Sequence, residues 1–386
     1  MRLACGRWLV WCGSAAWVLS GAGAHAQESS WVLRVARRFA VPDTIPLERT
    51  FRAVWSRSGE ALLTVRGLPY VVVLDRTGRA RPPIGRAGAG PGEFRSVAQL
   101  GWLADTLWAY DPLAERLTFI ARDGAVRTAA PPSVPRRFSV RASVEAVLSD
   151  GSLLLAEGFS SPDRTAILEG GYLLFRVSED GRTVDTLRVL HYGDSWLVAR
   201  LPGGRGEVQL PQPWGTRDLL GVSPDGGSVV VLERPLVATQ QGSEYRLSGL
   251  SASGQVVFRT SVPYQPVPLR ESTVARWIEE TAAGLEAAFG NAAAAREALR
   301  DALVRPRFLP PASAIVVGRH GIIWVQREDD GAGTRWDVFT PAGERTRAVR
   351  GPPGLRLLDV SAGRALGLLR RGDASDLVEL SLERVR

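Results

Sequence analysis

Cysteine is nearly absent from this chain. Its 386 residues include only Cys5 and Cys12, and both lie in an N-terminal segment with the features of a secretory signal. Once that segment is removed, the chain has no thiol for a disulfide, a nucleophile or a metal ligand. A chain of this length can bury a large core and needs no covalent cross-link for stability.

Histidine and lysine are also scarce. The chain has three histidines, of which only His191 and His320 follow the signal segment, and it has no lysine. Metal sites and histidine-based acid–base sites need several convergent groups, so we expect no metal, no cofactor and no catalytic residue that spacing could reveal. The formal charge of +8 is spread over the whole length, which is typical of a mixed solvated surface and, with export, argues against a nucleic-acid partner.

Long apolar runs are missing as well. Residues 1–26 combine Arg2 and Arg7 with a short apolar stretch and end in Ala24-His25-Ala26, which fits a signal peptidase site. This stretch is shorter than the ~20 residues of a transmembrane helix. We therefore expect a signal peptide cleaved after Ala26, a soluble mature chain without a transmembrane segment, and a periplasmic or secreted location. A lipid-modified Cys12 is the alternative, which Trp11 before it disfavours.

Apolar runs of strand length, separated by glycine-containing turns, fill the rest of the chain. In the first such unit, the runs 51–54, 61–65 and 70–74 flank turns that end at Gly59 and Gly78. Recurrence of four short strands with a period of about 40 to 50 residues is the signature of propeller blades. The units lie near 51–95, 97–130, 141–190, 217–268, 312–350 and 355–386. The pattern predicts an all-β fold, a six-bladed β-propeller of four-stranded antiparallel blades over residues 27–386.

Two segments complete this architecture. The last unit is one strand short, so residues 31–39 are predicted to supply its outer strand and to close the ring. Residues 272–304 turn alanine-rich, and Val274, Ile278 and Leu285 recur at helical spacing. We expect a helical hairpin inserted between the fourth and fifth blades, with its apolar stripe packed on the propeller; docking of a partner on that stripe is the alternative.

A family resemblance lies between the first two units. The segments Gly85–Phe94, Asp105–Asp111 and Arg116–Phe119 resemble the NHL-like repeat of bacterial six-bladed β-propellers. The resemblance implies the fold over most of the chain. Propellers of this type serve as protein-binding platforms, as RNA binders and, in a minority, as lyases or hydrolases, so the resemblance does not choose a function.

Five residues of this region are candidates for ligand binding: Arg86, Glu93, Trp108, Asp111 and Arg116. Asp111 and Arg116 bracket a short loop, which predicts that they pair with each other. The alternative is that the polar members stabilise the blade through ion pairs and turn capping, and that Trp108 is a core residue.

Two functions remain open on the sequence. The favoured hypothesis is a monomeric, non-enzymatic scaffold that binds an unknown protein or small-molecule ligand in the cell envelope at the loops around the channel. The alternative is a propeller hydrolase or lyase acting on a sugar, lactone or peptide at the central channel. An enzyme should gather several Asp, Glu, His or Arg side chains with perturbed pKa values at one mouth of the channel.

Overall fold

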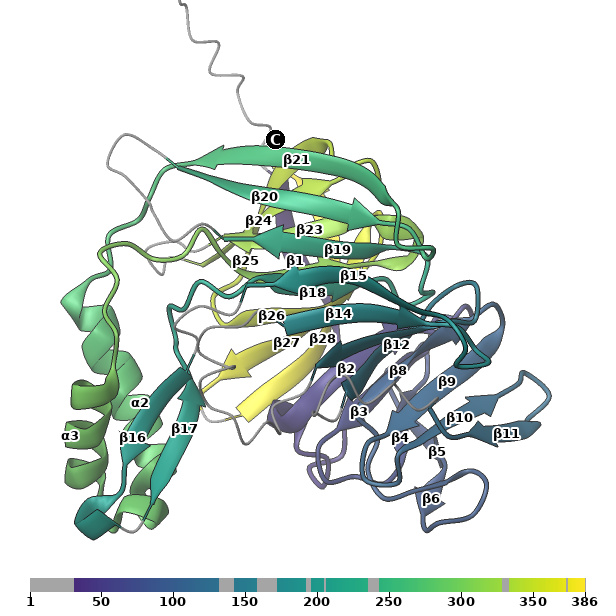
Figure 1. Cartoon of the computed structure of the whole chain (residues 1–386), viewed down its shortest axis with the longest axis horizontal. Coiled ribbons are helices and arrows are strands. Elements are labelled where there is room, and N and C mark those ends of the chain that lie inside the picture. Colours follow the sequence, from purple (N-terminus) through teal and green to yellow (C-terminus); the bar gives the residue numbers. More distant parts are fainter. Residues whose placement is uncertain are drawn as a thin grey trace, which may run out of the picture.

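The computed structural model describes residues 31–131, 142–157, 172–191, 196–204, 206–234, 243–327, 333–372 and 374–385. The predicted signal peptide and both cysteines lie outside the described residues. The chain is built mainly of antiparallel sheets that are arranged like the blades of a propeller (Figure 1). The prediction of an all-β, propeller-like fold is confirmed.

Four sheets each contain four strands. The first consists of β2 (Thr50–Trp55), β3 (Ala61–Val65), β4 (Val71–Leu74) and β5 (Ala80–Ile84). The second consists of β8 (Gln99–Leu103), β9 (Thr106–Asp111), β10 (Arg116–Ile120) and β11 (Val126–Ala129). The third consists of β12 (Ala142–Val147), β13 (Leu153–Glu157), β14 (Tyr172–Val177) and β15 (Val184–Leu190). The fourth consists of β18 (Leu219–Val222), β19 (Val229–Glu233), β20 (Ser243–Leu250) and β21 (Val256–Tyr264).

A fifth sheet has eight strands in the order β22-β23-β24-β25-β1-β28-β27-β26. One half consists of β22 (Ala312–Val317), β23 (Ile323–Arg327), β24 (Thr334–Phe339) and β25 (Arg345–Gly351). The other half consists of β1 (Trp31–Arg38), β28 (Ala374–Arg384), β27 (Arg364–Arg371) and β26 (Leu355–Val360). The strands of all five sheets agree closely with the units predicted from the sequence.

The N-terminal strand β1 joins the last unit, as predicted. It pairs antiparallel with β28 from Trp31 opposite Arg384 to Arg38 opposite Val378. Its contact with β25 is parallel and limited to the pairs that Trp31 and Val32 make with Val349 and Arg350. The long antiparallel ladder therefore assigns β1 to the same half as β26, β27 and β28.

The first strands of the units face one another across the middle of the molecule. The Arg52 guanidinium on β2 donates to the Val222 carbonyl at the end of β18, at 2.9 Å, and Trp102 N on β8 donates to Pro224 O at 2.7 Å. Gly226 lies so close to β12 that an added Cβ would be 2.3 Å from Val147 O. Its φ of +66° also favours glycine. Sequence-distant strands thus meet around a narrow centre.

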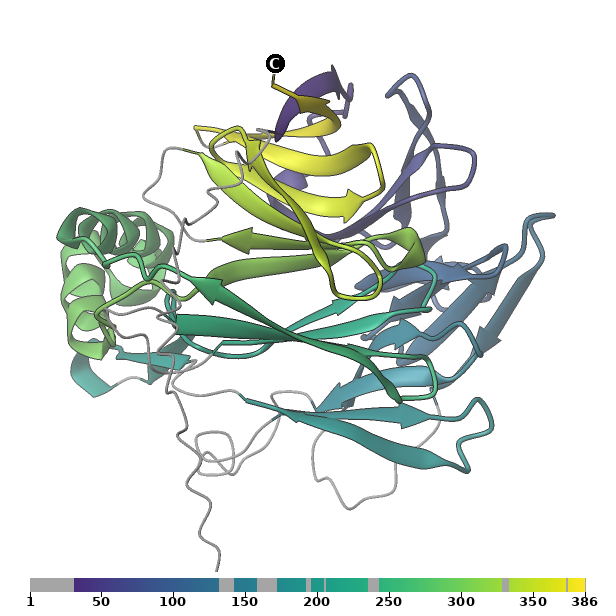
Figure 2. The same cartoon turned by 90° about the horizontal axis from the view of Figure 1, so that it is seen from above.

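A separate hairpin and two helices lie together at one side of the sheets (Figures 1 and 2). The hairpin is formed by β16 (Trp196–Arg200) and β17 (Glu207–Pro211), and the helices are α2 (Glu271–Phe289) and α3 (Ala292–Ala302). α2 ends at Gly290 in the left-handed conformation, and the Asn291 side chain caps α3 by accepting from Ala294 N. The predicted helical hairpin is therefore present.

The apolar stripe of the helices packs differently from what the sequence suggested. Val274 and Ile278 lie in one core cluster with Leu197 and Ala199 of β16 and with Trp214. The partner of the stripe is thus mainly the β16–β17 hairpin, which the sequence did not predict, and not a blade. An ion pair from Arg370 on β27 to Glu280 on α2, at 3.7 Å, links the helices to the last unit.

Candidate functional site

The turns that follow the first strand of each unit converge at one end of the sheets around a cavity of about 1220 Å³. Each unit contributes at least one lining residue from this turn: Arg57, Ala104, Ser149, Asp225, His320 and Ala362. Because these turns are the local consequence of the repeated strand-turn-strand pattern, the repeat itself places them side by side. We call this cavity the mouth cavity.

Three arginines, Arg57, Arg319 and Arg364, line the mouth cavity. Arg57 forms an ion pair with Asp105, and Arg364 lies 3.5 Å from Glu379. Arg319 donates to Trp55 O at 3.4 Å and lies over the Trp102 ring, 5.8 Å from its centroid. A guanidinium carries several N–H donors, and the described hydrogen bonds of Arg319 use one of them. Arg57 and Arg364 are each paired with an acid, whereas Arg319 has no ion pair among the described residues, so Arg319 is the cation best placed to meet a ligand.

Asp359 is the buried acid of the same wall. It is 4% exposed, and its two carboxylate oxygens accept from Trp55 N and Val360 N, each at 2.8 Å. Burial raises the pKa of Asp359 to about 6, although these two hydrogen bonds and the nearby cations Arg52 and Arg319 oppose the rise. Its charge therefore changes close to neutral pH.

The pKa of Asp225 is shifted in the opposite direction, below its ordinary value. Its carboxylate accepts from the backbone N–H groups of His320 and Gly227 at 3.3 and 3.4 Å. Partial burial alone would raise the pKa of Asp225, but these bonds and one from Ser223 hold it below the ordinary value. Asp225 is a fixed anion that anchors the turn carrying His320.

Further charges line the centre of the molecule next to Asp359. Burial raises the pKa of Glu145 on β12, although Ser143 donates to its carboxylate at 2.7 Å and Arg52 attracts it. Burial also lowers the pKa of Arg52, against the attraction of Asp359 and Glu145. Arg52, Glu145 and Asp359 therefore form one coupled group of charges.

The raised pKa of Asp359 predicts how stability depends on pH. The folded chain holds this proton more tightly than the unfolded chain, so the contribution is most favourable below the ordinary pKa and is lost as pH rises to about 6. Burial also raises the pKa of Glu145, so its contribution to stability likewise falls as pH rises. The loss at Asp359 is at most about 3 kcal/mol. Urea unfolding at about pH 4 and pH 7 should show a smaller pH dependence in Asp359→Asn, whereas the exposed Asp43→Asn should keep it. Equal pH dependence in all three proteins would contradict the assignment.

The candidates around the first loop lie elsewhere. Arg86 pairs with Glu93 at 2.9 Å, and the Glu93 carboxylate also accepts from Gly90 N at 2.8 Å. Arg86 and Glu93 belong to β6 (Arg86–Ala87) and β7 (Glu93–Phe94), which pair in parallel. Arg116 donates to Ala89 O at 2.6 Å and to the carbonyl of Glu93. Together these contacts hold the loop 85–94 in place.

The expected pair between Asp111 and Arg116 is wrong. The two residues are opposite one another in the ladder of β9 and β10, but their side chains turn to different partners. Asp111 is fully buried and accepts from Arg95 N, Leu113 N and Ala114 N at 2.6, 3.0 and 3.0 Å. The Asp111 carboxylate thus accepts from backbone N–H groups, and the Arg116 guanidinium donates to backbone carbonyls. Trp108 is 2% exposed and belongs to the core between units. None of the five candidates lines the mouth cavity.

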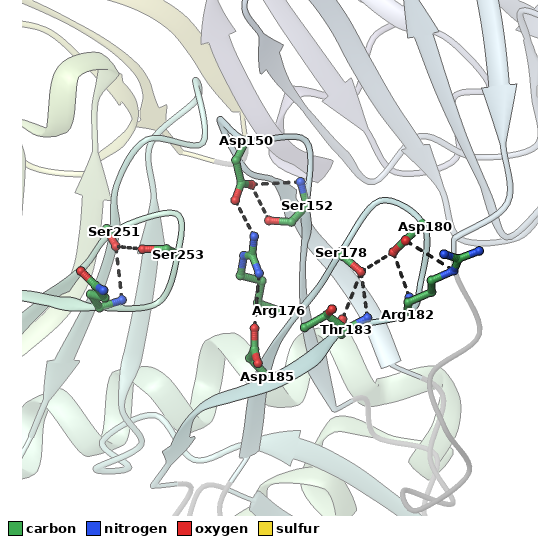
Figure 3. A network of polar contacts seen from close by, with 11 residues as sticks. Asp150, Ser152, Arg176, Ser178, Asp180, Arg182, Thr183, Asp185, Ser251 and Ser253 are labelled. Carbon is green, nitrogen blue, oxygen red and sulfur yellow. Dashed lines mark hydrogen bonds and ion pairs between the residues drawn. The ribbon is translucent and has the colours of Figure 1, made fainter.

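A polar network on the third sheet pairs Arg176 with acidic side chains of the same blade (Figure 3). Arg176 bridges Asp150 at 2.6 Å and Asp185 at 3.3 Å, and Ser152 N donates to Asp150 at 3.0 Å. Hydrogen bonds from Ser152 and Arg176 lower the pKa of Asp150, although its partial burial opposes them. Each charge is matched within the sheet, so this network serves blade structure.

Within the described residues, no group of three or more His, Cys, Asp or Glu side chains is placed to hold a metal ion. Of the helices that the structure describes, none is both long enough and apolar enough to cross a membrane.

Comparison with known proteins gives similarity to solved structures only. No family model and no curated protein sequence matches the chain. Among solved structures, a member of the DUF4221 family from Bacteroides vulgatus is 9% identical, with a TM-score of 0.48 over 92% of this chain and 99% of that one. A candidate exported protein from Bacteroides fragilis is 10% identical, with a TM-score of 0.44 over 93% and 96%. Virginiamycin B lyase from Staphylococcus aureus is 12% identical, with a TM-score of 0.38 over 92% and 89%.

Sequence reasoning identified the turns of the mouth but not their residues as a site. The repeat predicts a glycine-containing turn after the first strand of each unit, as at Gly59, without marking any side chain of these turns as functional. Asp359 was missed, because nothing in the run 355–360 distinguishes it from the strand around it.

Proposed function

We propose that the chain is an exported six-bladed β-propeller whose last blade is closed by β1. The count follows if the two halves of the eight-stranded sheet are separate blades, since only two register pairs join β1 to β25. The NHL-like motif in residues 85–119 supports the same count. Export rests on the signal sequence in residues 1–26.

We further propose that this propeller is a binding protein for a small organic anion, held in the mouth cavity. The observation that carries this proposal is Arg319, which lines a large cavity and has guanidinium N–H donors that no described residue accepts. Both carboxylate oxygens of the neighbouring Asp359 accept from backbone N–H groups. This carboxylate is protonated, and so loses its charge, as pH falls through about 6. A cavity of 1220 Å³ somewhat exceeds the usual range for drug-sized ligands, about 300–1,000 Å³.

Calorimetric titration with glucuronate and glucose tests this proposal, since the two sugars share a ring and differ in the carboxylate. We expect residues 27–386 to bind glucuronate more tightly than glucose, and Arg319→Gln to weaken glucuronate binding by about tenfold or more, as for a lost charge-assisted hydrogen bond. Arg276→Gln, an exposed change of equal charge on α2, is the matched control. Equal affinity for both sugars, or equal loss in both variants, would exclude anion binding at the mouth.

The pH dependence gives a second readout of the same site. Protonation of Asp359 removes a negative charge beside Arg319, so glucuronate should bind more tightly at about pH 5 than at pH 7. In Asp359→Asn that contribution should disappear.

One observation favours the alternative of a hydrolase or lyase. A carboxyl group with a pKa of about 6 in a cavity wall suits proton transfer near neutral pH, and polar groups with perturbed pKa values do gather at one mouth. Against this, both oxygens of Asp359 already accept backbone hydrogen bonds. If the mouth were catalytic, lactone or peptide probes would turn over in the wild type, and Asp359→Asn would abolish turnover while retaining binding.

A further inference from the structure

A second cavity, of about 610 Å³, opens between the first and second sheets beside the mouth cavity. We call it the inter-blade groove. It shares Ser56, Arg57 and Trp102 with the mouth cavity but extends outward along the sheets. Its size lies within the range of about 300–1,000 Å³ that is usual for ligand pockets.

The floor of the inter-blade groove is aliphatic. Leu62 and Val73 come from the first sheet, Leu107 and Ile120 come from the second, and all four belong to the core layer that packs the two sheets together. Ile84 of β5 extends the floor toward the outer edge of the first sheet. A straight apolar chain could therefore lie along the floor in contact with both sheets.

The rim of the groove carries more positive than negative charge. Of its acids, Asp105 pairs with Arg57, and Glu60 accepts from Ser58 at 2.7 Å. Arg81 and Arg122 are exposed, and neither has an ion pair within 4 Å in the part of the chain that the structure describes. Hydrogen bonds from Thr77 and Arg79 lower the pKa of Asp75, and the charge of Arg81 adds a smaller contribution. The guanidinium groups of Arg81 and Arg122 stand on opposite sheets at the edge of an apolar floor.

We propose that the inter-blade groove binds a free aliphatic carboxylate, with the chain on the floor and the carboxylate between Arg81 and Arg122. The charge complementarity of the rim selects the anionic head, and the aliphatic floor selects an unbranched chain over a sugar. This site is independent of the anion site proposed for the mouth, because Arg81 and Arg122 do not line the mouth cavity and Arg319 does not line the groove.

Titration of residues 27–386 with hexanoate, octanoate and decanoate tests the floor. Affinity should rise with each added CH₂ by up to about fourfold, which is the ~0.8 kcal/mol of a buried methylene. Octanoate should bind more tightly than 1-octanol, and added salt should reduce that difference because the rim is exposed. An affinity independent of chain length would contradict the proposal.

Substitutions at the rim test the head group. The double variant Arg81→Gln/Arg122→Gln should raise the Kd of decanoate by about fivefold to tenfold, as expected for two exposed cation–carboxylate contacts, and should leave 1-octanol unaffected. Arg276→Gln is again the control for loss of surface charge, and thermal melts confirm that each variant is folded.

Two further outcomes would overturn the assignment. If Arg319→Gln weakened decanoate as much as the double variant does, the carboxylate would be in the mouth and not in the groove. If the protein bound phosphatidylglycerol vesicles through Arg81 and Arg122 but not free decanoate, the rim would be a membrane contact. Loss of glucuronate binding in Arg319→Gln with intact decanoate binding would separate the two sites.

Discussion

Leu33→Asp is expected to prevent stable folding, whereas Val35→Asp on the same strand should be tolerated. Leu33 is 5% exposed and packs among Trp324, Trp336 and other core residues of the eight-stranded sheet. Val35 is 36% exposed. A buried, unpaired carboxylate costs several kcal/mol, which is comparable with the whole stability of a typical domain, about 5–15 kcal/mol. The exposed carboxylate at position 35 has no such cost.

Urea unfolding followed by circular dichroism would measure the difference between these two variants. We expect Leu33→Asp to unfold at much lower urea than the wild type, or to be unfolded without urea, and Val35→Asp to unfold close to the wild-type midpoint. Since β1 pairs along most of its length with β28, loss of β1 exposes the edge of β28. Equal midpoints for the two variants would show that β1 is dispensable.

Asp337→Asn should destabilise the fold by about 3–5 kcal/mol, the usual result of removing one partner from a buried ion pair. Asp337 is fully buried. It accepts from Arg327 at 3.0 Å, from Arg345 at 2.8 Å and from the Tyr245 hydroxyl at 3.0 Å. Burial and the Asp337 carboxylate both raise the pKa of Tyr245, so this hydroxyl remains a donor at neutral pH. The amide would leave the cations without their counter-ion.

Two controls separate charge from hydrogen bonding at this site. Tyr245→Phe removes one neutral donor and should cost about 1 kcal/mol. Asp376→Asn breaks partly exposed pairs with Arg38 and with Arg371, the latter at 3.4 Å, and should cost about 0–1 kcal/mol for each pair. Free energies of unfolding from urea titrations check the order. If Asp337→Asn cost no more than Asp376→Asn, the buried network would be of little importance for stability.

Local patterns explain why most of the sheets could be predicted from the sequence. A strand of four to six apolar residues and a turn with glycine are set by neighbouring residues, so the predicted run 61–65 coincides with β3, Ala61–Val65. The helices were found for the same reason. The β16–β17 hairpin was missed because it lies between the third and fourth units and interrupts the repeat.

The site depends on contacts that no local pattern contains. Arg52 meets Val222 from 170 positions away, and Trp55 N meets Asp359 from 304 positions away. Such pairs form only after the sheets surround a common centre, and the pKa of Asp359 follows from that burial. The candidates from residue 86 to residue 116 were chosen from a contiguous motif, and the structure shows that motif holding its own loop.

A crystal structure of residues 27–386 with 4-bromobenzoate would test the central claim most directly, because the anomalous signal of bromine locates the bound anion. We expect the carboxylate to contact Arg319 in the mouth cavity, in line with a propeller whose first turns form an anion site. Bromine peaks confined to scattered surface arginines or to the helical side of the molecule, with none in the mouth cavity, would contradict the account.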